Sequence, residues 1–297
     1  MKRGLFFYIL ITIISGCKAQ QNKQVFKIAD TNNSLLWQVS GKGLSKPSFL
    51  FGTFHLLCKD DIKFSDQLRS AVKYADEIYM ELDMDDPSTL MSGLFYMNMK
   101  NGKMLKDFYT PEEYKRIETY FNDSLHTPLM MFQKVKPYFL VALLYPKMMK
   151  CKIFSGVEEE VMKLAKENKK EILGLETIEF QSSVFDSIPY DLQAKELINN
   201  LDSLPKYANQ FDSMMLAYKD QQLKILERGL RESDAAMDKY EDLLLNRRNA
   251  NWVKQLNVIM KNKSVFVAIG AGHLVGDNGL INLLRKQGYK VVPLMNR

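Results

Sequence analysis

The chain has 297 residues, of which 46% are hydrophobic, and a formal net charge of +6. This is enough apolar material for the substantial core of one large domain or two small ones. Basic and acidic residues are interleaved along the sequence and form no basic stripe, so the charge pattern argues against a nucleic-acid partner.

The N-terminus has the pattern of an export signal. Lys2 and Arg3 precede an apolar run, 5–14, that is too short to span a bilayer. The next residues, Ile-Ser-Gly-Cys ending at Cys17, resemble the bacterial lipobox. That resemblance implies cleavage before Cys17 and attachment of lipid to it.

Three parts of the chain follow from this pattern. We expect a lipoprotein signal in 1–17, a flexible polar tether in 18–34 and one folded domain in 35–297. Lys18 does not resemble an aspartate-type inner-membrane retention signal, so the expected location is the outer membrane in the cell envelope of a Gram-negative bacterium. The lipid anchor would make the membrane a partner of the chain.

Apolar runs and helical periodicity alternate along the rest of the sequence. Strands are predicted at 35–40, 48–53, 77–84, 171–175, 264–269 and 290–294. Helices are predicted at 60–75, 86–100, from 110 onward, 128–149, 156–168, 178–185, as a pair within 189–230, and at 233–261 and 278–287. The first two strands should form a hairpin, and 128–149 should be one buried helix. The fold class is therefore α/β of the mixed type, with a central sheet covered by many helices.

Two of the three histidines occur in matched positions. His55 and His273 each end a Gly-x-x-His step that directly follows an apolar strand, whereas His126 lies in a polar segment and is expected in a loop. Sites in open α/β sheets form outside the carboxyl ends of the strands. We therefore predict that the two Gly-x-x-His loops meet.

Carboxylates end two other predicted strands. Glu81 and Asp83 end one strand, and Glu176 ends another. Two histidines with one or two carboxylates form a nitrogen and oxygen ligand set that suits Zn, Mn, Co or Fe(II), with positions left open for water and substrate. A histidine acting as general base for Thr53 is a non-metal alternative, although the chain has no Gly-x-Ser-x-Gly elbow.

Two cysteines remain after Cys17. Cys58 and Cys151 could form a disulfide in an oxidising compartment or stay as buried thiols. Because Cys58 lies three residues after His55, thiolate ligation of a metal is a third alternative.

The chain resembles the TraB/GumN family, including its Tiki branch. Most of the domain contributes short matching motifs in the same order: Leu36-Trp37-Gln38-Val39, Gly52-Thr53-Phe54-His55, Glu81-Leu82-Asp83, Gly174-Leu175-Glu176-Thr177 with Gln181, Arg248-Asn249 with Trp252, and Gly270-Ala271-Gly272-His273-Leu274 with Gly276 and Gly288-Tyr289. The resemblance implies a fold related to erythromycin-esterase-like and ChaN-like proteins. It also implies a divalent-metal-dependent hydrolase, which cleaves peptides in the Tiki branch.

The resemblance also assigns roles to residues. His55, His273 and Glu81 become the expected ligands of a divalent metal (Mn, Co or Zn). Glu81, Glu176 and Arg248 become candidate catalytic residues, and the last two would act by orienting the metal ligands or by binding substrate. Many relatives carry an aspartate near Glu158, where this chain has three consecutive glutamates, so the resemblance assigns these acids no role.

Three functions are weighed. The first is a lipid-anchored metal-dependent hydrolase, chiefly a peptidase, that acts on a peptide or small-molecule substrate. The second is a lipoprotein of the same fold that binds haem or a small ligand through exposed histidines. The third is a non-catalytic protein that binds a peptide or signal.

Overall fold

The structure, a computed structural model, describes residues 25–233 and 239–297 around a central mixed sheet. The order of the strands is β6-β4-β7-β2-β1-β8. The first four of these run parallel, and β1 is antiparallel to both of its neighbours. The strands are β1 (Leu36–Ser40), β2 (Ser48–Thr53), β4 (Glu77–Leu82), β6 (Ile172–Glu176), β7 (Val265–Gly270) and β8 (Lys290–Pro293). The predicted mixed α/β class and the β1–β2 hairpin are confirmed.

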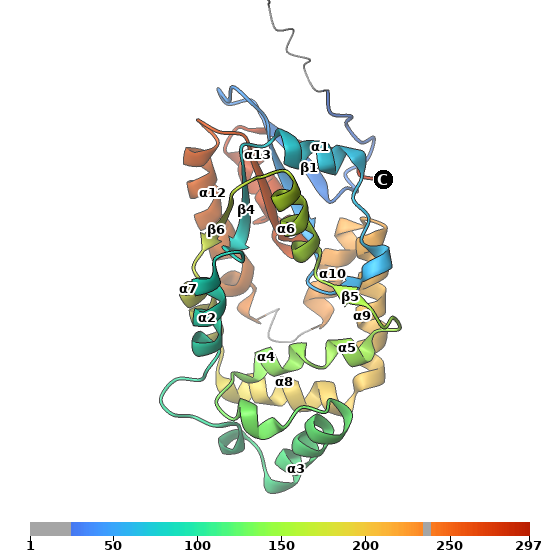
Figure 1. Ribbon diagram of the computed structural model, residues 1–297, viewed down its shortest axis with the longest axis vertical. Helices are drawn as coiled ribbons and strands as arrows, with labels where there is room; N and C mark the ends of the chain where they lie inside the picture. The colour runs from blue at the N-terminus through green and yellow to red at the C-terminus, as the bar shows by residue number, and fades with distance from the viewer. Residues whose placement is uncertain (1–24, 234–238) are drawn as a thin grey trace, which may run out of the picture.

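Helices cover both faces of this sheet (Figure 1). The crossovers from β2 to β4 and from β4 to β6 run in one direction across the sheet, and those from β6 to β7 and from β7 to β8 run in the other. Because such crossovers are right-handed, the helices of each pair share a face and the two pairs lie on opposite faces. One face carries α1 (Asp66–Tyr74) and α6 (Val157–Glu167), and the other carries α12 (Arg247–Ile259) and α13 (Leu280–Lys286).

The remaining helices extend the molecule beyond the carboxyl ends of the parallel strands (Figure 1). They are α2 (Pro87–Tyr96), α3 (Pro111–Thr119), α4 (Pro137–Ala142), α5 (Tyr145–Met148), α7 (Ile178–Asp186), α8 (Tyr190–Asp202), α9 (Leu204–Lys219) and α10 (Leu223–Ser233). Short turns are η1 (Lys59–Asp61), η2 (Leu105–Phe108), η3 (Tyr120–Ser124), η4 (Leu129–Phe132), η5 (Asp242–Asn246) and η6 (Ala271–His273), and a small ribbon joins β3 (Leu57–Cys58) to β5 (Phe154–Ser155). Within the described ranges, no helix has both the length and the apolar character needed to cross a bilayer.

The two strands that lead to the Gly-x-x-His steps, β2 and β7, lie in the hydrophobic core at the centre of the sheet. All six residues of β2 are buried, as are the first five of β7. Gly52 allows β2 to lie close to the turn that follows β7, because a Cβ there would lie 2.8 Å from the Leu274 side chain and 3.1 Å from Ala271. A larger residue at this position would push the two loops apart.

Some predicted helices are wrong in extent. The segment 128–149 is broken into η4, α4 and α5, because Pro137 and Pro146 each occupy the first turn of a new helix. Met130 and Met131, which were expected in the interior, are 81% and 74% exposed. The segment 189–230 was expected to form two helices, but three helices, α8, α9 and α10, begin within it. Of the single helix expected at 233–261, residues 234–238 lie outside the described ranges, and the described part includes η5 followed by α12.

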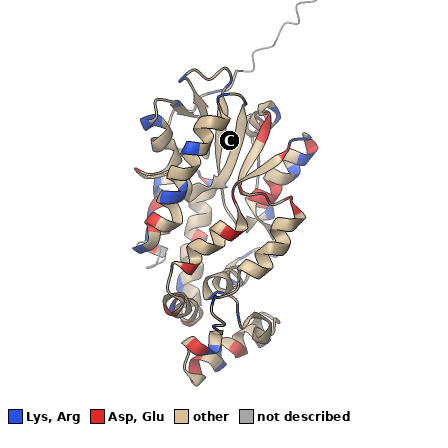
Figure 2. Cartoon of the chain, turned by 90° about the vertical axis from the view of Figure 1, so that its left-hand side faces the viewer, with Lys and Arg blue, Asp and Glu red and all other residues tan. Residues whose placement is uncertain are grey.

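The folded body begins before residue 35. Phe26 packs on Phe49 with ring centroids 4.7 Å apart, and Ile28 forms a β-bridge with Leu294. The expected signal, Cys17 and the tether up to residue 24 lie outside the described residues. Basic and acidic residues are interleaved along the helices (Figure 2), as in the sequence.

Candidate active site

The register of the sheet places the expected site residues at one edge. Thr53 of β2 pairs with Gly270 of β7, so both strands end at the same level of the sheet. His55 and His273 follow them within a few residues. On the other side of β7 lies β4, which carries Glu81. Beyond it, Glu176 pairs with Leu82 at the end of β6. Four parallel strands therefore deliver the two histidines and the two glutamates to the same end of the sheet.

His273 is buried, with 4% of its surface exposed, and both of its ring nitrogens have partners. Nε2 lies 3.2 Å from Nη1 of Arg248, which can only donate, so Nε2 is the acceptor. Nδ1 must then carry the proton that it donates to Oδ1 of Asn249 at 2.7 Å. Burial lowers the pKa of His273 to about 3, so the imidazole is neutral at neutral pH.

Arg248 is the centre of a buried charged cluster. Its Nε contacts both carboxylate oxygens of Glu176 at 3.1 and 3.0 Å, and its Nη2 donates to Oε2 of Glu81 at 2.8 Å. The Glu176 side chain is 1% exposed and that of Arg248 is 9% exposed. The guanidinium also lies over the ring of Trp252, 4.9 Å from its centroid. A charged group so deeply buried is tolerated because its partners satisfy it.

The carboxylates of this cluster have different proton affinities. Burial works to raise the pKa of Glu81, but the charge that His273 gains in acid, the Arg248 guanidinium and the backbone N–H of Gly270 hold it at about 2. Gly270 donates to Oε1 of Glu81 at 2.9 Å, and Gln181 donates to Oε2 at 3.0 Å. Burial raises the pKa of Glu176 in spite of its bonds to Arg248. Glu81 is therefore a firmly ionised group, held in position by three donors.

His55 belongs to a separate, exposed pair. Its side chain is 80% exposed, and Nδ1 lies 2.8 Å from Oε1 of Glu158 in the first turn of α6. Thr53 donates its hydroxyl to the same oxygen at 2.7 Å. The negative charge of Glu158 raises the pKa of His55 to about 9. The other ring nitrogen, Nε2, is left without this constraint and can exchange protons with a ligand.

Sequence reasoning missed the role of Glu158 as a partner of His55. The signal was a local one: a short strand ends at Ser155, and Gly156 is followed within two residues by Glu158. This repeats the strand-Gly step of the two histidine loops with an acid in place of the histidine. Because β5 pairs only with β3 and lies outside the main sheet, position in the sequence alone could not place Glu158 beside His55.

The structure shows the state of the two cysteines and the position of the third histidine. Cys58 and Cys151 form a disulfide with their Cα atoms 5.9 Å apart, which rules out Cys58 as a thiolate ligand. The bridge ties β3, directly after His55, to the segment before β5, and so it braces the His55–Glu158 pair from both sides. His126 lies exposed in a turn with φ of 53°, as expected for a loop residue.

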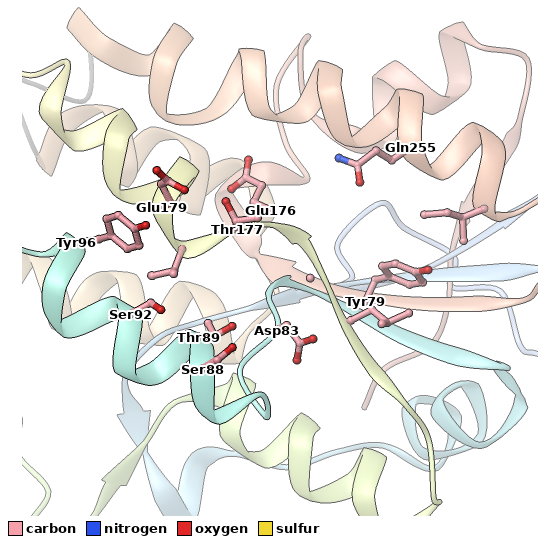
Figure 3. A pocket seen from close by; sticks show the side chains of 14 residues that line it. Tyr79, Asp83, Ser88, Thr89, Ser92, Tyr96, Glu176, Thr177, Glu179 and Gln255 are labelled. Atoms are coloured by element: carbon pink, nitrogen blue, oxygen red, sulfur yellow. The ribbon is translucent and has the colours of Figure 1, made fainter.

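A cavity of about 620 Å³ adjoins the buried cluster (Figure 3). Glu176, Thr177 and Asp83 line it from the ends of β6 and β4, and hydroxyl side chains of α2 line the opposite wall. Asp83 thus lines this cavity, whereas Glu81 does not, and burial together with neighbouring Asp85 raises the pKa of Asp83. Among the residues that the structure describes, no Lys, Arg or His lines the cavity.

The expected ligands do not converge on a metal position in this arrangement. Nε2 of His273 lies 3.8 Å from Oε1 of Glu81, but Arg248 contacts both residues, and His55 is bonded to Glu158 instead. In the part of the chain that the structure describes, no three His, Cys, Asp or Glu side chains are grouped so that they could hold a metal ion. The donor types suit a divalent cation, but their positions as they stand do not.

Comparison with known proteins agrees with the motifs. The model of the TraB/PrgY/gumN family matches residues 35–293. Metalloprotease TIKI1 of Danio rerio is 24% identical over 87% of this chain and 63% of its own length, and Metalloprotease TIKI1 of Homo sapiens is 24% identical over 87% and 61%. Metalloprotease TIKI2 of Xenopus tropicalis is 24% identical over 87% and 59%. The chain thus spans less than two thirds of these relatives. No solved structure matches it.

Proposed function

Because the chain belongs to the TraB/PrgY/gumN family, we propose that it is a divalent-metal-dependent hydrolase that cleaves peptides at the edge of the sheet between β2, β7 and β4. The observation that carries this proposal is the register of β2 with β7, which sets the two Gly-x-x-His steps side by side and next to Glu81. A divalent metal, when bound, supplies an acidified water molecule and a polarised carbonyl.

The residues of the chain have distinct roles in this proposal. His55 exchanges protons through Nε2, while Glu158 orients the ring through Nδ1. Glu81 provides an ionised carboxylate, and Asn249 fixes the tautomer of His273 that leaves a lone pair on Nε2, which lies 3.8 Å from Oε1 of Glu81. Arg248 and Glu176 position Glu81.

The adjoining cavity is a candidate binding place for part of the substrate. Its hydroxyl groups, carboxylates and the Gln255 amide can bond a peptide backbone, and its lack of basic side chains disfavours an acidic substrate. Glu176 lines the cavity and also contacts Arg248, so a peptide held there would lie beside the cluster.

We also propose that the protein is a lipoprotein anchored through Cys17 in the outer membrane. The support is the sequence alone, because the lipobox-like residues lie outside the described ranges. Metabolic labelling with a radioactive fatty acid, lost in Cys17→Ala, tests the anchor.

The experiment that tests the activity is hydrolysis of a peptide library by the mature chain, after removal of metal with a chelator and after reloading with Mn²⁺, Co²⁺ or Zn²⁺. We expect cleavage only after reloading, abolished in His55→Ala and in His273→Ala and retained in His126→Ala. Cleavage that survives in both site variants would refute the assignment. If no peptide is cleaved and haemin binds instead, the ligand-binding alternative replaces it.

A further inference from the structure

Arg248 uses its guanidinium donors within the buried cluster. Nε contacts Glu176, Nη2 contacts Glu81 and Glu176, and Nη1 contacts the carbonyl of Leu244 at 2.9 Å and Nε2 of His273 at 3.2 Å. A guanidinium has five N–H donors in a fixed plane, so this arrangement leaves it little freedom to turn without breaking contacts.

The two buried expected ligands are correspondingly occupied by donors. His273 has one ring nitrogen with a free lone pair, Nε2, and Arg248 faces it. The oxygens of Glu81 accept from Gly270 on one side and from Arg248 and Gln181 on the other. Glu81 keeps one unused lone pair on Oε1, but a divalent cation would also need the Nε2 lone pair of His273, and Arg248 occupies that one.

The charges point in the same direction. Arg248 places one positive charge between the carboxylates of Glu81 and Glu176, and Nε2 of His273 accepts from Arg248 and so carries no proton. Arg248 thereby supplies the charge that a cation would supply. A divalent ion placed beside the guanidinium would be repelled, and in a poorly solvated site the repulsion is strong.

We propose that Arg248 closes the metal site in the arrangement described, and that a divalent cation binds His273 and Glu81 only after the guanidinium has moved off them. This inference rests on the proposed metal dependence and explains why His273 and Glu81 lie close together without sharing a metal position. Glu176 contacts Nε and Nη2 of Arg248, so the guanidinium keeps one carboxylate partner after it has moved off His273 and Glu81. Arg248 is thus a competitor of the metal.

The opposite role is a clear alternative, because an arginine that holds Glu81 in place could equally assist metal binding. The two roles predict opposite effects of removing the guanidinium. If Arg248 competes, Arg248→Met should bind metal more tightly. If Arg248 positions Glu81 for the metal, the same variant should bind metal more weakly.

The test is calorimetric titration of the metal-free mature chain with Zn²⁺. We expect Arg248→Met to bind Zn²⁺ about tenfold or more tightly than the wild type, because a competing positive charge is removed. Arg247→Met is the matched control, since Arg247 is the adjacent residue but is 70% exposed and pairs with Asp242. It should bind like the wild type, and Arg248→Met/His273→Ala should lose the tight binding.

A second measurement leaves Arg248 in place, in case its replacement prevents folding. The chain has two tryptophans, so Trp37→Phe leaves Trp252, against which the guanidinium lies, as the single emitter. Saturating Zn²⁺ should change its emission. An unchanged spectrum under saturation, or equal or weaker Zn²⁺ binding by Arg248→Met, overturns the inference and leaves the proposed function standing. No Zn²⁺ binding by any of these proteins overturns both.

Discussion

The His55–Glu158 pair gives the sharpest prediction, because its effect is local and can be measured without a substrate. In Glu158→Gln, the side chain keeps its size but loses the negative charge that raises the pKa of His55 from 6.5 to about 9. Because the ring is 80% exposed, water screens its interaction with Glu158. The difference between a pKa of 6.5 and one of about 9 is therefore the upper limit of the change. The pKa of His55 should therefore fall toward 6.5 in the variant.

The change is large in terms of protonation. At pH 7.5 a group with a pKa of 9 is about 97% protonated, whereas a group with a pKa of 6.5 is about 9% protonated. If His55 accepts a proton during hydrolysis, the acidic limb of the kcat/KM profile should move to lower pH in Glu158→Gln, while the maximal rate falls because the ring is less well oriented. The pair also stabilises the fold below pH 6.5, and this contribution is lost as the pH rises through about 9.

The assay is a proton NMR titration of the histidine rings in the wild type and in Glu158→Gln. The reasoning is refuted if the pKa of His55 in the wild type lies at its ordinary value of 6.5, or if it is the same in both proteins.

Three further predictions concern stability. The double variant Cys58→Ser/Cys151→Ser opens a loop whose ends are 93 residues apart in the sequence. It should lower the free energy of unfolding, measured by urea titration, by about 4.6 kcal/mol. A loss below about 1 kcal/mol would show that the bridge does not constrain the unfolded chain. Glu176→Gln leaves Arg248 with one carboxylate in a buried cluster and should lower the free energy of unfolding by about 3 kcal/mol. The control Glu179→Gln, at a nearby exposed residue, should lower it by less than about 0.5 kcal/mol. Equal losses in the two variants would contradict the claim that Glu176 neutralises Arg248 in the cluster. The pKa of Glu81 in the folded protein, about 2, lies below its ordinary value of 4.5. Ionised Glu81 therefore stabilises the fold above pH 4.5, and this contribution is lost as the pH falls toward 2. The Tm of the wild type should drop more steeply in acid than the Tm of Glu81→Gln.

Much of the frame of the site follows from local sequence. The apolar strands before His55 and His273 are recognisable because both faces of a covered sheet require apolar residues, and the glycines after them mark close backbone approach. The parallel neighbours of such strands meet at one edge, so the proximity of Glu81 and Glu176 could also be expected.

The partners within the site could not be predicted in the same way. Arg247 and Arg248 are adjacent on one helix, and the sequence gives no reason why one is 70% exposed and the other 9%. Their difference arises because α12 turns one side toward the ends of β4 and β6, which is a tertiary fact. The pairing of Glu158 with His55 likewise depends on how α6 packs. The prediction of a single helix at 128–149 is wrong because Pro137 and Pro146 each begin a new helix within an apolar segment.

The central claim is that His55 and His273 form one metal-dependent site. Elemental analysis of the purified mature chain after reloading with Mn²⁺, Co²⁺ or Zn²⁺ tests it most directly, with His55→Ala/His273→Ala and His126→Ala prepared in parallel and checked for folding by circular dichroism. We predict about one metal ion per chain in the wild type and in His126→Ala, and none in the double variant. Metal retained by the double variant, or absent from all three proteins, would contradict the account.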